Sequence, residues 1–72
     1  METRVFDRTV TVRNSDGERS QVFNRGERVN HISHIGPAAM FEPVNPRHIG
    51  GTYVMDWTEF EMVTTAVREA RA

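Results

Sequence analysis

The branched aliphatic residues of this chain are nine valines and three isoleucines, and leucine is absent. β-Branched side chains fit the pleated surface of a sheet better than a helix, because a helical backbone restricts their χ1 rotation. The composition therefore predicts a fold made mainly of strands. The chain has 72 residues and no cysteine, so neither a disulfide nor a thiolate metal site can compensate for a small core.

Alternating side chains predict one strand over residues 4–13. In this stretch, RVFDRTVTVR, apolar and polar residues alternate as they do in a half-buried strand. The NSDG sequence at 14–17 favours a tight turn, because Asn, Ser and Asp bond nearby backbone groups and Gly17 accepts a positive φ. We expect a hairpin whose second strand runs through ERSQVF. One face of the first strand carries Phe6, Arg8, Val10 and Val12.

A third strand is predicted over ERVNHISHI, residues 27–35, ending at Gly36–Pro37. The AAMFEPV stretch at 38–44 fits either a fourth short strand or one helical turn after Pro37. Residues 47–55, RHIGGTYVM, predict a compact hairpin with its turn at Gly50 and Gly51. Simple alternation places one set of third-strand residues on a common face: Val29, His31, Ser33 and Ile35.

The last segment predicts an amphipathic helix over residues 56–71. Asp56 suits the N-cap, with Glu59 as its capping-box partner. A start with Thr58 as the cap and Glu61 as its partner fits the same rule. Helical spacing places one apolar stripe along the segment: Trp57, Phe60, Val63, Val67 and Ala70.

These patterns predict an α+β fold, a small curled antiparallel sheet of four to five short strands with one C-terminal amphipathic helix. We expect one domain over 1–72, with 1–55 mainly β and 56–71 helical. The FNRGERV stretch, residues 23–29, followed by strands broken at glycines, resembles the start of the strands in SH3-like barrels. The resemblance implies that the sheet could close into such a barrel.

The three histidines raise the question of a metal site. His31 and His34 are three residues apart, a spacing that would place them on opposite faces of a regular strand. His48 could join them only if the intervening chain folds back, and Glu42 would then have to supply a fourth ligand. We therefore expect no metal, with His31 half-buried beside the strand's apolar residues and the other two solvated.

Catalytic and cofactor motifs are absent from the sequence. Ser15, Ser20 and Ser33 lack the G-x-S-x-G context of a nucleophile elbow. The glycine pair at 50–51 is followed by neither a helix start nor a lysine, so it does not predict a phosphate site. We expect neither an enzyme nor a bound cofactor.

Charge weakens the case for nucleic-acid binding without excluding a local patch. The net charge is −1, and the basic residues of the first 30 positions are nearly balanced by acids. Arginines of the N-terminal half could still gather on one side of the hairpin, with Phe23 between them, and bind single-stranded nucleic acid or RNA. The arginines of this alternative interface are Arg8, Arg19, Arg25 and Arg28, with Arg4 nearby.

Protein binding is the first hypothesis from the sequence. The segment from Pro37 to Tyr53 is long for a connection in so small a domain, and such segments commonly carry function. It is rich in residues that favour interfaces, although the same residues could instead complete the core. The expected contact residues are Met40, Phe41, Arg47, His48 and Tyr53.

We therefore expect a non-enzymatic accessory or inhibitor protein, of the kind encoded by phages or mobile elements, acting stoichiometrically on a larger protein. Spare apolar surface would also support a homodimer. The first residues carry charges throughout and no apolar run approaches a membrane span, so a cytoplasmic protein without membrane contact is expected.

Overall fold

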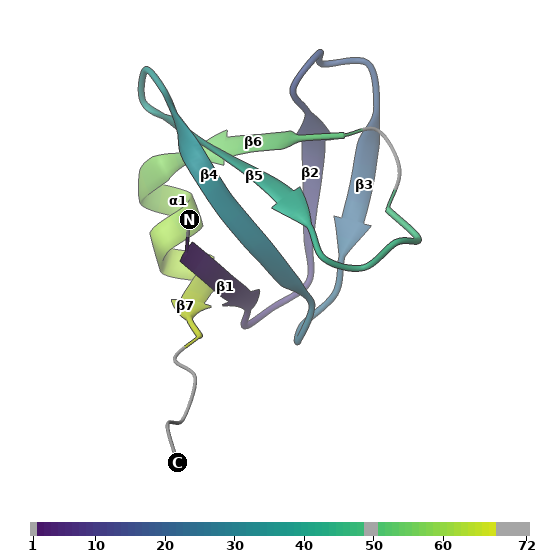
Figure 1. The fold of residues 1–72 in the computed structure, drawn as a ribbon, viewed down its shortest axis with the longest axis vertical. Helices are drawn as coiled ribbons and strands as arrows, with labels where there is room; N and C mark the ends of the chain where they lie inside the picture. Colours follow the sequence, from purple (N-terminus) through teal and green to yellow (C-terminus); the bar gives the residue numbers. More distant parts are fainter. Residues whose placement is uncertain (1, 49–50, 68–72) are drawn as a thin grey trace.

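The computed structural model describes residues 2–48 and 51–67, which form one antiparallel sheet of seven strands and one short helix (Figure 1). The sheet order is β3-β2-β6-β5-β4-β1-β7. The predicted combination of a small antiparallel sheet with one helix is confirmed, whereas the predicted number of strands is too low. The elements are β1 (Glu2–Phe6), β2 (Val10–Asn14), β3 (Ser20–Phe23), β4 (Arg28–Ile35), β5 (Ala38–Pro43), β6 (Tyr53–Asp56), α1 (Trp57–Val63) and β7 (Thr64–Ala66).

The single strand expected over residues 4–13 is two strands. β1 pairs with β4 and β7, whereas β2 pairs with β3 and β6. The chain turns between them, where the backbone N–H of Asp7 donates to the carbonyl of Val63. Phe6 and Val12 are both buried. Apolar and polar residues therefore keep alternating through the turn, and the alternation does not reveal that the strand is interrupted there.

The hairpin between β2 and β3 is confirmed. Val10 pairs with Phe23 and Arg13 with Ser20, without a register shift. In the turn, the Asp16 carboxylate accepts the backbone N–H of Glu18, and Gly17 adopts a φ of +79°. Local turn chemistry is sufficient to fix this register.

β4 and β5 form a second hairpin around Gly36–Pro37, so residues 38–43 are a strand and not a helical turn. The ladder contains a bulge at Ile32: His31 pairs with Phe41, but the next pair is Ser33 with Met40. The extra residue reverses the alternation beyond it. The predicted common face is therefore wrong: Val29 and His31 lie on the inner face, toward the core, and Ser33 and Ile35 lie on the outer face.

α1 begins as predicted, with the Asp56 carboxylate accepting the N–H groups of Thr58 and Glu59. Its predicted end at residue 71 is wrong, because the helix stops at Val63 and Thr64–Ala66 continue as β7 beside β1. Of the predicted stripe, Phe60 and Val63 are buried in the core and Trp57 packs against it. Ala70 lies outside the described residues.

The hairpin predicted over 47–55 is also corrected. Arg47 and His48 lie outside any strand, and β6 pairs with β5 and β2. Gly50 lies outside the described residues, and Gly51 adopts a φ of +78°.

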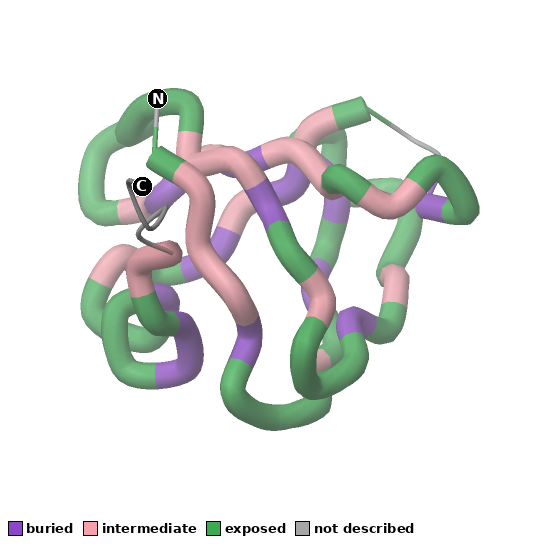
Figure 2. Tube along the Cα trace, turned by 60° about the horizontal axis from the view of Figure 1, so that its bottom comes forward, coloured by how far each residue is buried: buried purple, intermediate pink, exposed green. Residues whose placement is uncertain are grey.

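One aromatic-rich core lies between the curled sheet and α1 (Figure 2). Aromatic rings dominate it because the chain has no leucine, and many of them meet edge to face, an arrangement that favours their packing. Within the described residues, no helix has the length and apolar character required to cross a membrane. The buried hydrophobic residues are Phe6, Val12, Phe23, Val29, Ala39, Phe41, Tyr53, Met55, Phe60 and Val63.

Candidate functional site

Three of the five predicted protein-contact residues are buried. Phe41 and Tyr53 are 0% exposed and His48 is 7% exposed. Their side chains cannot form a surface contact in this conformation, because the curl of the sheet turns β5, β6 and the 44–48 segment over the same core. Burial also raises the pKa of the Tyr53 hydroxyl, partly offset by the charge of Arg19. Met40 and Arg47 remain accessible.

Arg47 and His48 belong to a polar cluster around one carboxylate, which we call the Glu27 clasp (Glu27, Asn24, Asn45, Arg47 and His48). The Glu27 Oε1 atom lies 2.6 Å from the Nε2 atom of His48, and the Arg47 guanidinium donates to Oε2 at 3.0 Å. The backbone N–H of Asn24 donates to Oε2 at 2.6 Å, and the Asn45 amide to Oε1 at 3.4 Å.

The Glu27 clasp joins the 45–48 segment to the turn before β4. Burial of the Glu27 carboxyl raises its pKa, but the Asn24 N–H, His48 and Arg47 together outweigh this effect and hold the pKa below its usual range. The His48 ring stacks on Phe23 at 4.1 Å. These contacts give Arg47 and His48 a structural role that the sequence alone did not indicate.

His31 and His34 meet on the inner face, contrary to the expectation for a regular strand. The bulge at Ile32 brings their ring centroids to 4.9 Å. Trp57 lies against both rings, at 5.3 Å from His31 and 4.4 Å from His34. Across residues 2–48 and 51–67, no three potential ligand side chains form a group that could hold a metal. The cluster is one of aromatic packing, in which the Nε2 atom of His31 is buried without a described hydrogen-bond partner.

The arginines of the alternative interface are divided between two ends of the molecule. Arg8 follows β1 and Arg25 precedes β4, and these ends are adjacent because the N–H of Gly26 donates to the carbonyl of Phe6. Arg19 lies in the β2–β3 turn at the opposite end (Figure 1). Phe23 is 0% exposed, so it cannot stack on a base. Arg28 begins β4 and is exposed.

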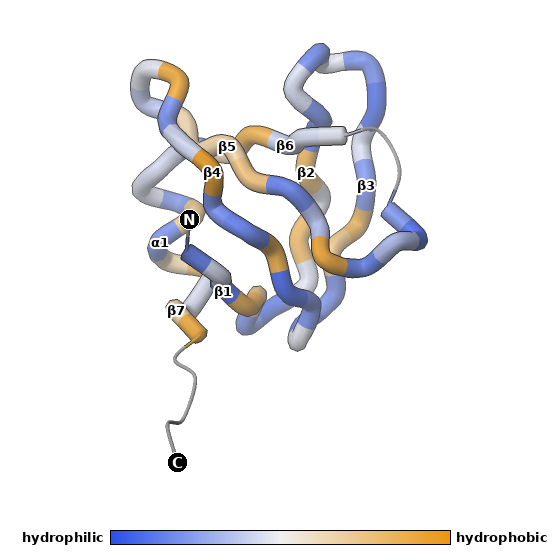
Figure 3. Tube along the Cα trace, viewed as in Figure 1, coloured by the Kyte–Doolittle hydropathy of each residue, from blue (hydrophilic) through white to orange (hydrophobic). Residues whose placement is uncertain are grey.

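Apolar side chains on the outer face of the sheet form what we call the outer patch (Ile35, Ala38, Met40 and Val54). Ile35 pairs with Ala38 across β4 and β5, and Met40 pairs with Val54 across β5 and β6. Ile35 is 52% exposed, and the other three are half-buried. Hydrophobic residues of both faces colour part of β5 and part of β6 in Figure 3. The outer patch faces away from the core, and packing within the described chain covers three of its four side chains only in part.

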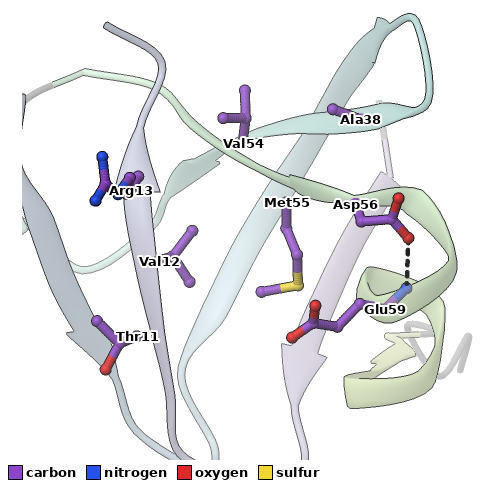
Figure 4. Close-up of a pocket in the computed structure, with 8 residues that line it drawn as sticks. All are labelled: Thr11, Val12, Arg13, Ala38, Val54, Met55, Asp56 and Glu59. Carbon is purple, nitrogen blue, oxygen red and sulfur yellow. Dashed lines mark hydrogen bonds between the residues drawn. The ribbon is translucent and has the colours of Figure 1, made fainter. Parts of the chain in front are cut away.

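A pocket of about 320 Å³ opens beside the outer patch. It exists because β2 and β6 separate after only two ladder pairs, Arg13 with Val54 and Asn14 with Tyr53. Val12 points from β2 toward Met55, and the Glu59 carboxylate lies beside the Met55 side chain (Figure 4). The lining residues are Thr11, Val12, Arg13, Ala38, Val54, Met55, Asp56 and Glu59.

The charge of the pocket is unbalanced. Within the described residues, neither Asp56 nor Glu59 forms an ion pair. The Arg13 guanidinium instead donates to the carbonyl of Gly17 in the β2–β3 turn, at 3.4 Å. The pocket therefore combines an apolar wall with two carboxylates and one guanidinium that pairs with neither of them. Sequence reasoning missed it because no local pattern indicates where two strands separate.

Comparison of the chain with protein-family models, with curated protein sequences and with solved structures finds no match in any of the three. The outer patch and the pocket are therefore the features of the molecule that bear on its function.

Proposed function

We propose that this chain is a small non-enzymatic protein-binding module that binds a larger protein stoichiometrically through the outer patch. The observation that carries the proposal is a contiguous set of apolar side chains on the sheet face opposite the core, of which Ile35 is exposed and the other three are half-buried. An apolar patch beside a pocket is typical of interaction surfaces. Met40 is the one member of the outer patch that the sequence had also indicated.

Part of each outer-patch side chain remains accessible in the fold. Full burial of an exposed Ile, Met or Val contributes roughly 1.5–3 kcal/mol, and a partner can gain part of this from the outer patch. Arg13 and Asp56 border the patch as polar residues, and a polar rim around an apolar centre is the usual composition of a protein interface. Since the side chains lie on paired strands, little conformational entropy is lost on binding.

The small size of the chain and its composition suggest a more specific role. An accessory or inhibitor role in the cytoplasm, of the phage or mobile-element kind, suits a small chain without catalytic motifs. We also propose that the sheet curls in the manner of an SH3-like barrel, because backbone bonds from Phe6 to Glu27 and Gly26 draw the β3–β4 turn against β1. A second copy of the chain on the outer patch would be a homodimer, which sedimentation would detect.

The test is a tagged pull-down from cells of the source organism, with and without nuclease. We expect a defined protein to be retained after nuclease, and Ile35→Ser to reduce its recovery about tenfold. The matched control is Val22→Ser on β3, since Val22 is 48% exposed and Ile35 is 52% exposed.

Equal recovery with both variants would contradict the outer patch as the contact surface. Recovery that collapses with nuclease would instead favour nucleic-acid binding. In that case Arg8, Arg25 and Arg28 would be the residues to substitute, and binding should fall steeply with salt.

A further inference from the structure

We infer that the pocket between β2 and β6 binds one lysine or arginine side chain from an extended segment of the partner. This inference rests on the proposed function, because it names the chemistry of the partner beside the outer patch. Its volume of about 320 Å³ is at the lower end of ligand pockets, a size suited to one long side chain.

The walls of the pocket fit the aliphatic stem of such a side chain. Val12 and Met55 are 3% and 9% exposed and form its inner wall, while Ala38 and Val54 contribute from the outer patch. The methylene groups of lysine and arginine pack on apolar surfaces of this kind while the charged head stays at the polar end. Met55 is unbranched, so it can adjust to the shape of the stem.

The carboxylates select for a cationic head group. Asp56 and Glu59 lie at the α1 end of the pocket without an ion-pair partner in the described chain. Arg13 also lines the pocket, but its guanidinium donates to the carbonyl of Gly17 and pairs with neither carboxylate in the described chain. A neutral side chain could fill the apolar wall but would cover the Glu59 carboxylate without a counter-charge, while Asp56 keeps its bonds to the N–H groups of Thr58 and Glu59. An acidic side chain would be repelled by both carboxylates.

The backbone of β2 explains why the segment would be extended. The N–H of Asn14 points to β3, where it donates to Arg19, and the N–H of Ser15 points toward β6, where it donates to Thr52. Alternation therefore directs the backbone N–H and carbonyl of Thr11 to the β6 side, beyond the last β2–β6 pair. These groups are available to bond the backbone of a partner strand, as in β-strand addition.

The experiment is an NMR titration of the full chain with Nα-acetyl-lysine N-methylamide. The control ligand is Nα-acetyl-norleucine N-methylamide, which keeps the stem and lacks the ammonium group. We expect saturable shifts at the amides of Thr11, Met55 and Glu59, with a dissociation constant of about millimolar for so small a ligand. Norleucine should bind about tenfold more weakly.

Two substitutions on α1, each removing one negative charge, show whether lysine binding depends on the charge at the pocket or on the overall charge of the helix. Glu59→Gln should weaken lysine binding severalfold, whereas Glu61→Gln should not, because Glu61 is exposed outside the pocket. Equal binding of lysine and norleucine, or no shifts at the pocket, would overturn the inference.

The pull-down distinguishes this failure from that of the proposed function. If Ile35→Ser lowers recovery of the partner and Glu59→Gln leaves it unchanged, the module stands and the cation pocket is wrong. If neither variant changes recovery, both proposals fail.

Discussion

The Nε2 atom of His48 lies 2.6 Å from the Oε1 atom of Glu27, and this contact joins two segments 21 residues apart. The same carboxylate accepts from Asn24, Asn45 and Arg47. One side chain thus holds the 45–48 segment against the turn before β4. The stability of that segment should depend on Glu27 more than on any single apolar contact it makes.

Glu27→Gln should lower the free energy of unfolding by about 1–3 kcal/mol, because the amide cannot reproduce the charge-assisted bonds to His48 and Arg47. Urea unfolding near neutral pH would measure this change. Glu18→Gln in the exposed β2–β3 turn is the matched control and should be nearly neutral. An equal effect of the two substitutions would contradict the role of the Glu27 clasp.

The pH dependence of stability has a definite sign. The Glu27 pKa is lowered in the folded chain, so the carboxylate stabilises the fold above its ordinary pKa of 4.5, and this contribution is lost as the pH falls through the folded value. Urea unfolding between about pH 5 and pH 3 should therefore show a steeper loss for the native chain than for Glu27→Gln. Parallel curves for the two proteins would show that Glu27 is not the group responsible.

His31→Phe should keep or increase stability, by up to about 1 kcal/mol. The substitution preserves the ring against Trp57 and Phe60 and removes a buried nitrogen that has no described partner. His31→Ala should instead cost about 1–3 kcal/mol, since it leaves these rings without a neighbour. Trp57 fluorescence during urea unfolding would measure both. A large loss with phenylalanine would indicate that the ring nitrogen has a role.

Thr64→Val should destabilise the fold by about 1–2 kcal/mol. The Thr64 hydroxyl accepts the Arg4 Nε–H at 2.7 Å, and valine would leave that guanidinium without this bond. The Arg4 side chain is only 12% exposed, so water cannot fully replace the contact. Thr65→Val is the control, because Thr65 is exposed on the same strand. Thermal unfolding of the two variants would test the difference, and equal midpoints would refute it.

The features predicted correctly are those that depend on near neighbours in the chain. Asp56 caps α1 because its carboxylate reaches N–H groups two and three residues ahead. The turn at Gly17 is likewise decided by residues within it. Such local geometry does not require knowledge of where the rest of the chain lies.

The errors arise where distant pairing decides the outcome. Thr64–Ala66 continue the helical spacing of α1, yet pairing with β1 draws them into a strand, which their threonines also favour. The bulge at Ile32 is set by the pairing of β4 with β5. The order of apolar and polar residues along β4 does not indicate it. The sequence leaves open whether residues such as Phe41 and Tyr53 form a contact surface or complete the core, because their burial depends on the curl of the whole sheet.

The position of β1 has a consequence for how the protein is made. Of the strands described, β1 is synthesised first, yet it is sixth across the sheet and lies between β4 and β7. Its partners are synthesised much later: His31 follows Glu2 by 29 positions, and Ala66 follows Arg4 by 62. A nascent chain that has not yet reached β7 leaves one edge of β1 open to other strands, so this sheet cannot be completed before β7 has been synthesised.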